Sequence, residues 1–170
     1  YYKLHVCQLN EINPEVLDRD EQGLPKIRDS FGGNYEGGLS ILGQRLQDRE
    51  PGLAGLEQAL AFHRKVLQRH PGVVTFLNNA ALTARDLAEG TAALAQGPDR
   101  VQQVERSLAL HEEAYGWYLR AIELAPDDPR LLNDCALMQV YYLKRDYGRA
   151  EELLREAIRG GNDRLATLGR

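Results

Sequence analysis

The chain contains an internal repeat. The run LNNAAL begins at Leu77, six residues after Pro71, and the run LNDCAL begins at Leu132, six residues after Pro126. Both the prolines and the runs are 55 residues apart. Self-similarity at a fixed offset is typical of repeat proteins, in which each supersecondary unit buries its apolar face against the next copy. The sequence therefore predicts stacked repeats, an architecture that favours a binding scaffold over an enzyme.

From Gly52 onward, apolar residues recur at helical spacing between prolines and glycines that interrupt the pattern. We expect helices at about 53–70, 73–88, 99–125, 130–143 and 147–159. The last helix is expected to end at Gly160-Gly161, because glycine is the preferred residue just past a helix. Helices of this length joined by short turns form antiparallel hairpins. The predicted fold class is therefore all-α.

The third of these helices has the most regular pattern. Asp99 is followed three residues later by Gln102, the spacing of a capping box at a helix start. Seven residues then recur at alternating intervals of three and four, as expected for one helix face: Val101, Val104, Leu108, His111, Tyr115, Tyr118 and Ile122. We expect this face to lie against the core.

Residues 1–50 differ from the rest, because prolines and glycines interrupt them too often for a long helix. We predict a mostly irregular N-terminal segment that contains a short helix from about Gly38 to Gln47. The predicted organisation is an irregular segment at 1–50, a helical domain at 51–160 and a C-terminal tail at 161–170.

The charge of the chain limits its partners. Its 25 acidic and 21 basic residues are interspersed and give a formal net charge of −4, so no basic stripe is available for a nucleic-acid backbone. No run of 18 uncharged apolar residues is present, which predicts that no transmembrane helix is formed. We therefore expect a protein or peptide partner, with no nucleic acid and no membrane insertion.

The cysteines and the start of the chain bear on its location. Cys7 and Cys135 are distant in sequence and give no disulfide framework, so two ordinary thiols are expected. With no visible signal peptide, the preferred location is the cytoplasm. The chain begins at Tyr1 and not at Met, so an upstream targeting sequence could be missing.

The helical part of the chain resembles the tetratricopeptide repeats, in which helix pairs of about 34 residues stack into a superhelix. The second helix of that family has small, bulky, small and turn-proline positions, and this chain has Ala114, Tyr118, Ala121 and Pro126 at the same spacing; Ala150, Leu154 and Ala157 repeat it. Small residues are needed where neighbouring helices approach closely, since overpacking costs about 1–3 kcal/mol. The resemblance covers residues 53–159.

One departure from the family pattern indicates an insertion. Ala81 and Ala114, two small positions of one repeat, are much farther apart here than in an unmodified repeat, so residues near 90–100 are expected to be extra. The resemblance implies antiparallel hairpins in a short right-handed superhelix. It also implies an interaction module without chemistry of its own, so neither enzymatic activity nor a cofactor is expected.

In such a superhelix, the first helix of each pair lines the concave face. The resemblance maps the partner-binding groove onto Asn78, Asn79, Leu82, Arg85, Asn133, Asp134, Leu137 and Tyr141. Side-chain amides there can hold the backbone of an extended peptide, with Asn78 and Asn133 forming a short ladder. The alternative is that these two amides bond local backbone and tie down the preceding turns. A clamp for a terminal carboxylate is disfavoured, because Asp134 opposes the only candidate cation, Arg85.

The sequence offers weaker candidates for catalysis or metal binding. His5 and Cys7 would point the same way on a strand, but a nucleophile also needs a base oriented by a third group. His63 and His70 are seven residues apart, wider than usual metal-ligand spacing, and we interpret them as a core-edge and a surface histidine. His111 interrupts an apolar face, and we interpret it as a buried, hydrogen-bonded imidazole. No catalytic or metal residue is therefore predicted.

Three functional hypotheses follow from this sequence. The leading one is a non-catalytic scaffold that binds a peptide or partner protein in a concave helical groove. The second is a structural subunit of a larger assembly, because only about two and a half repeats are visible and a free array usually needs three. The third is a regulatory domain of an enzyme.

Overall fold

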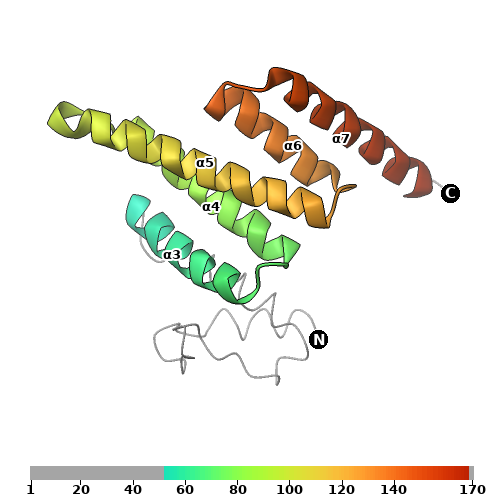
Figure 1. Ribbon diagram of the computed structural model, residues 1–170, viewed down its shortest axis with the longest axis horizontal. Coiled ribbons are helices and arrows are strands. Elements are labelled where there is room, and N and C mark those ends of the chain that lie inside the picture. Colours follow the sequence, from blue (N-terminus) through green and yellow to red (C-terminus); the bar gives the residue numbers. More distant parts are fainter. Residues whose placement is uncertain (1–51, 169–170) are drawn as a thin grey trace. The chain divides into compact units, whose positions relative to one another are not determined.

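The computed structural model describes residues 52–168, with side chains up to residue 162. All regular secondary structure in this part of the chain is helical (Figure 1), which confirms the predicted all-α class there. The predicted irregular segment 1–50, its helix at 38–47 and the pair His5 and Cys7 lie outside the described residues.

The chain divides into two compact units, one ending at Thr83 and the other beginning at Ala84. The first unit contains α3 (Leu53–Arg69) and the start of α4 (Val74–Ala93). The second contains the rest of α4 and five further elements: the 3₁₀ turn η2 (Gly97–Asp99), α5 (Arg100–Leu124), α6 (Pro129–Leu137), the π-helix η3 (Met138–Leu143) and α7 (Tyr147–Leu168).

Helix α3 matches the sequence prediction at both ends. It begins after Gly52, whose φ of 76° lies in the left-handed region that favours glycine, and it ends at Arg69, just before Pro71. Its buried residues are Gly55, Ala59, Leu60, Phe62, His63, Val66 and Leu67.

Helix α4 is longer than predicted. We expected it to end near Ala88, but it continues to Ala93. The hydroxyl of Thr91 donates to the Leu87 carbonyl at 2.7 Å, and Ser107 of α5 donates to the Ala88 carbonyl at 2.8 Å. Small residues fit either a linker or a helix, and these local bonds together with packing against α5 favour the helix.

The register of α5 corrects the sequence analysis. Val101, Val104 and Leu108 are 69%, 49% and 52% exposed, although the seven-residue pattern placed them against the core. The residues buried on α5 are Ser107, Leu110, His111, Ala114, Tyr118 and Ala121. The pattern holds only in the C-terminal half of α5, because α6 and η3 pack there.

The start of α5 also differs from the prediction. Asp99 does precede the helix, but its side chain accepts no capping hydrogen bond, since Asp99 is already part of the turn η2. The backbone N–H of Gln96 donates instead to Oε1 of Gln103, at 3.2 Å. A glutamine side chain therefore stabilises this turn, but it belongs to Gln103 and not to the predicted Gln102.

The predicted helix at 130–143 is present, but as an α-helix followed by a π-helix. Its start is capped by Asp128, which accepts from the Arg130 backbone N–H at 3.0 Å, and Pro129 occupies the first turn. From Met138 to Leu143 the chain is a π-helix, which ends at Lys144 in the left-handed conformation (φ 51°). Hydrophobic spacing did not reveal this change of helix type.

Helix α7 does not end where the glycine pair predicted. It runs through Gly160-Gly161 and continues to Leu168. A Cβ atom at Gly160 would lie 3.3 Å from Cγ of Pro129 and 3.7 Å from the Asp127 carbonyl oxygen. Gly160 thus allows α7 to approach the start of α6 closely, and a helix-terminating role is not needed to explain it.

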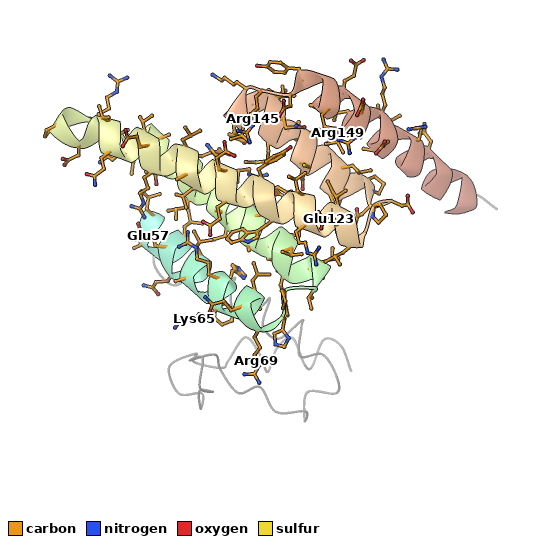
Figure 2. All side chains as sticks on the ribbon, in the orientation of Figure 1. Glu57, Lys65, Arg69, Glu123, Arg145 and Arg149 are labelled. Carbon is orange, nitrogen blue, oxygen red and sulfur yellow. The ribbon has the colours of Figure 1, made fainter. Side chains whose placement is uncertain are left out.

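Charged side chains lie on the outer faces of the helices and pair locally. Arg149 and Glu152 are 2.9 Å apart on α7, and Arg120 pairs with Glu123 on α5; Figure 2 labels Arg149 and Glu123. Exposed pairs of this kind contribute about 0–1 kcal/mol each. The fold is therefore stabilised mainly by burial of apolar side chains.

The core of the second unit is made of small and bulky residues in alternation. Its fully buried members include Ala114, Tyr118, Ala121, Leu131, Ala136, Met138 and Leu153. Alanines at helix contacts let backbones approach closely, which leaves no room for a longer side chain.

We expect Ala121→Leu to lower the free energy of unfolding by about 1–3 kcal/mol, because Ala121 is completely buried. Urea unfolding followed by circular dichroism measures the change. Ala109→Leu is the matched control on the exposed side of the same helix and should change stability by about 0.5 kcal/mol or less. Equal effects of the two substitutions would show that α5 is packed differently.

Candidate functional site

The eight residues predicted to line a groove are divided between the two units. Asn78, Asn79 and Leu82 lie on the part of α4 that belongs to the first unit. The other five belong to the second unit: Arg85 on α4, Asn133, Asp134 and Leu137 on α6, and Tyr141 on η3. All eight are at least partly exposed, so each presents some surface to a partner.

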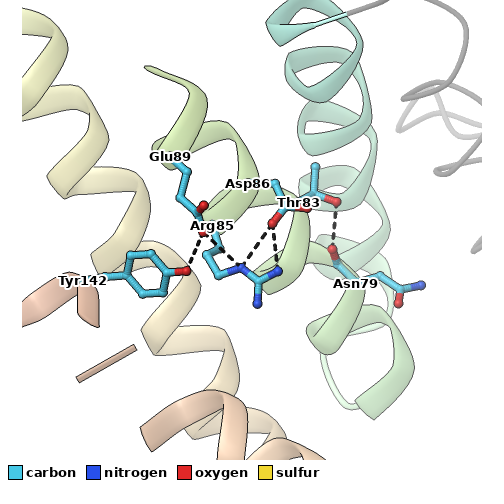
Figure 3. Close-up of polar contacts among 6 residues, drawn as sticks. All are labelled: Asn79, Thr83, Arg85, Asp86, Glu89 and Tyr142. Carbon is cyan, nitrogen blue, oxygen red and sulfur yellow. Dashed lines mark hydrogen bonds and ion pairs between the residues drawn. The ribbon is translucent and has the colours of Figure 1, made fainter. Parts of the chain in front are cut away.

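In the first unit, the predicted groove residues with polar side chains are Asn78 and Asn79 of α4. The Asn79 carbonyl accepts from the Thr83 hydroxyl at 2.9 Å (Figure 3). This bond uses the backbone of Asn79 and leaves its side-chain amide half-exposed. The ladder between Asn78 and Asn133 remains a prediction.

In the second unit, α4 and η3 are joined by a polar network (Figure 3). Arg85 donates to Oδ1 of Asp86 from Nε at 3.1 Å and from Nη2 at 2.9 Å, and its Nε lies 3.7 Å from Oε1 of Glu89. The Tyr142 hydroxyl donates to the same Glu89 oxygen. Burial, together with this bond, raises the pKa of Tyr142 to about 12, so the phenol keeps its proton at neutral pH.

Two residues of α5 lie beside this network. His111 and Tyr118 are seven residues apart, which places them on one face of the helix, and they are 8% and 0% exposed. The rings of His111 and Tyr142 are tilted by 35° relative to each other, with centroids 4.7 Å apart. Among the described residues, neither His111 Nε2 nor the Tyr118 hydroxyl has a hydrogen-bond partner. An unsatisfied buried polar group costs about 1–3 kcal/mol.

Asp134 of α6 completes the arrangement. Its carboxylate accepts from Nδ2 of Asn133 at 3.3 Å. Burial and then the negative charge of Asp134 raise the pKa of Tyr118, while Arg85 opposes this from α4. The phenol of Tyr118 is therefore close enough to charges on both α4 and α6 to be affected by each.

We refer to these seven residues as the polar cluster: Arg85, Asp86, Glu89, His111, Tyr118, Asp134 and Tyr142. The cluster contains three carboxylates and one guanidinium, and the Arg85 guanidinium lies 2.9 Å from Asp86 and 3.7 Å from Glu89. Burial lowers the pKa of His111, so its imidazole is neutral at pH 7 and adds no positive charge. The polar cluster thus has a net negative charge.

A second polar group lies where η3 meets α5. Arg145, labelled in Figure 2, donates from Nη1 and Nη2 to the two carboxylate oxygens of Glu112, both at 2.7 Å. Its guanidinium carbon lies 5.6 Å from the ring centroid of Tyr115. The Tyr115 hydroxyl accepts from Nε2 of the buried Gln139 at 3.0 Å. One arginine is thus held by a carboxylate and a tyrosine ring together.

The histidines differ in part from their sequence interpretation. His63 is only 4% exposed, so it is a core residue and not a core-edge one. His70 is half-buried, with its ring 5.9 Å from that of Phe76, and is not a free surface residue. His111 is buried as expected, and its Nε2 has no hydrogen-bond partner among the described residues.

The described residues contain no group of three or more His, Cys, Asp or Glu side chains placed to hold a metal ion. Burial raises the pKa of Cys135 to about 12, so it remains a thiol and a poor nucleophile at neutral pH. Within the same part of the chain, no helix combines the length and apolar character needed to cross a membrane.

Comparison with known proteins gives no relative: no protein-family model, curated protein or solved structure matches the chain. The residues described above are therefore the basis for assigning its function.

Two of the predicted groove residues, Arg85 and Asp134, belong to the polar cluster. Sequence reasoning missed Asp86 and Glu89 as partners of Arg85, although Glu89 follows it at the spacing of a helical ion pair. It named Tyr141, which is 64% exposed, whereas Tyr142 contacts His111 and Glu89. The π-helix changes the direction of side chains after Met138, and hydrophobic spacing gives no signal of it.

Proposed function

We propose that this chain is a non-catalytic, tetratricopeptide-like scaffold that binds a peptide or partner protein on the surface of α4 and α6. The polar cluster is the observation on which the proposal depends. It combines partly exposed charges on these two helices with buried polar atoms on α5 that have no hydrogen-bond partner among the described residues.

The packing at the positions that resemble the tetratricopeptide pattern supports this proposal. Ala114, Tyr118 and Ala121 on α5 are completely buried, and Ala150 and Ala157 on α7 are 1% and 9% exposed. These are the positions at which the tetratricopeptide pattern expects close contacts between helices. The antiparallel pair α6 and α7 packs along its length, as a helical hairpin of such a repeat would.

The amides of α4 and α6 support a peptide as the ligand. Asn78, Asn79 and Asn133 are each partly exposed, and an amide side chain offers both a donor and an acceptor at one position. An extended peptide backbone presents the complementary pair at every residue, so each of these amides can hold it independently of its sequence.

The test begins with a library of random peptides displayed on phage, selected against the full chain. We expect Asn78→Ala with Asn133→Ala to weaken binding of a selected peptide roughly tenfold or more, because each lost hydrogen bond is worth about 0.5–1.5 kcal/mol. Fluorescence anisotropy of the labelled peptide measures the dissociation constant.

The matched control removes two exposed amides elsewhere, Gln58 on α3 and Gln102 on α5. Gln58→Ala with Gln102→Ala should leave the affinity unchanged. The proposal fails if the library yields no binding peptide, or if the asparagine double variant binds the selected peptide as tightly as the original chain does.

A structural subunit of a larger assembly is the second candidate, and one observation favours it. Val101, Val104 and Leu108 form an exposed apolar stripe on the N-terminal half of α5. Exposed apolar stripes at helical spacing are typical of surfaces that another helix covers. Sedimentation equilibrium separates the candidates, since this one expects a mass above the 19.1 kDa of a single chain.

A further inference from the structure

We propose that η3 is a conformational switch between two helical registers. In the structure, residues 138–143 form a π-helix. In the second register, this segment is an α-helix, and each side chain after its first turn takes the place that the next residue holds in the π-helix. The inference goes beyond the proposed function, because the switch operates in the protein without a partner. It depends on the geometry of η3, the turn that follows it and the sequence of both.

The backbone of η3 contains one residue more than an α-helix between the same ends would need. The N–H of Lys144 donates to the Gln139 carbonyl, which is five residues earlier and not four, and the N–H of Arg145 donates to the same carbonyl at 3.1 Å. π-Helices are rare and occur mostly as single-turn insertions in α-helices. Conversion of η3 to an α-helix would move the surplus residue into the turn before α7.

The turn before α7 is strained in the present register. Lys144 and Asp146 have φ values of 51° and 53°, and they are the two non-glycine residues with positive φ in the described part of the chain. A side chain with a Cβ atom is disfavoured in this left-handed region. A turn that gains one residue has a less strained path to α7. The strain therefore reduces the advantage of the π-helix over the α-helix.

Two neighbouring tyrosines give both registers the same aromatic contact. In the π-helix, the Tyr142 hydroxyl donates to Glu89, and its ring centroid lies 4.7 Å from that of His111. Tyr141 is 64% exposed. A shift by one residue places the Tyr141 phenol where the Tyr142 phenol lies now. The second register thus keeps a ring and a hydroxyl beside the same partners.

Two neighbouring cations do the same for the ion pair, but they are not equivalent. Arg145 donates from Nη1 and Nη2 to the two carboxylate oxygens of Glu112, and its guanidinium carbon lies 5.6 Å from the ring centroid of Tyr115. After the shift, Lys144 supplies the positive charge at this place. An ammonium lacks the two-pronged geometry and the planar contact with the ring. Arg145 therefore makes the π-helix the major register.

The register decides which tyrosine the surface of η3 presents. Tyr141 is exposed in the π-helix and would be enclosed in the α-helix. A partner that contacts Tyr141 would therefore bind the π-helical register and increase its population. This consequence rests on the proposed function, whereas the switch itself does not.

Relaxation-dispersion NMR of the full chain tests the switch. We expect backbone amides of residues 138–147 to show exchange on the microsecond-to-millisecond timescale, or a second set of signals, with one common population. Arg145→Ala should raise the minor population roughly tenfold, because the charge-assisted bonds to Glu112 are made in the π-helix alone. Arg155→Ala is the matched control and should change nothing, since Arg155 pairs with Glu151 on an exposed face of α7.

A deletion provides the second test. Without Tyr141 the segment has no surplus residue, so it should close as an α-helix, show no exchange and keep its melting temperature within about 4 °C. Deletion of Gly116, an exposed residue of α5, is the control. It should lower the melting temperature by more than about 10 °C, because it turns Tyr118 and Ala121 away from the core.

Three outcomes would overturn the switch. The first is the absence of exchange from both the original chain and Arg145→Ala. The second is exchange that persists after Tyr141 is deleted, and the third is a loss of stability as large as that caused by deleting Gly116. No peptide is used in these measurements, so each of these outcomes leaves the scaffold proposal standing.

Discussion

Acidification from pH 7 to pH 4 is expected to lower the free energy of unfolding by roughly 3 kcal/mol through His63 alone. His63 is 4% exposed in the buried face of α3, and its ring lies 5.8 Å from that of Phe62. Burial lowers its pKa from 6.5 to about 4, because the charged imidazolium is poorly solvated there. Protonation of this side chain therefore opposes folding.

The direction of the effect follows from the two pKa values. Between pH 6.5 and about pH 4, the unfolded chain binds a proton at His63 and the folded chain does not. Each step down in pH within this window therefore favours the unfolded state. The stabilising contribution of the neutral histidine is fully present above pH 6.5 and is lost as the pH falls towards 4.

The measurement is urea unfolding at several pH values, with His63→Leu as the reference variant. Leucine does not titrate, so the stability of the variant should depend less on pH in this window by roughly 3 kcal/mol. Burial also lowers the pKa of His111, but that contribution is present in both proteins and cancels in the difference. Parallel pH profiles, or a His63 pKa near 6.5 by proton NMR, would contradict the prediction.

Sequence pattern predicted helix positions well where chain breakers are unambiguous. Pro71 marks the end of α3, and Pro126 lies just past the end of α5. The pattern was wrong at glycines and alanines, because these residues fit several conformations. Gly160 was taken as a helix end, whereas in the fold it makes room for Pro129. What such a residue does depends on its neighbours in space.

The candidate site shows the same limit. Arg85 and Asp134 were identified from the repeat pattern, because both lie at predictable positions on regular helices. His111 was expected to be hydrogen-bonded, since most buried polar groups are, and only the structure shows that its Nε2 has no partner among the described residues. The orientation of Tyr142 depends on the π-helix, which no hydrophobic spacing predicts. Sequence thus located the helices of the site but not its polar contacts.

Leu110→Ala is expected to lower the free energy of unfolding by about 2–5 kcal/mol, whereas Leu108→Ala should cost about 1 kcal/mol or less. Leu110 is 6% exposed and Leu108 is 52% exposed, although they are two residues apart on α5. The two variants make the same substitution in the same helix, so the change in helix propensity is the same. Urea unfolding at low protein concentration measures both.

The comparison decides between two registers of α5. The regular seven-residue pattern of the sequence places Leu108 in the core and predicts the opposite order of effects. If Leu108→Ala were the costlier variant at every concentration, the packing of α5 described above would be wrong. If instead it became costly only as the concentration rises, another copy would be covering the stripe of Val101, Val104 and Leu108. A cost that depends on concentration would therefore favour the structural-subunit candidate, and a small constant cost would leave the stripe exposed on a single chain.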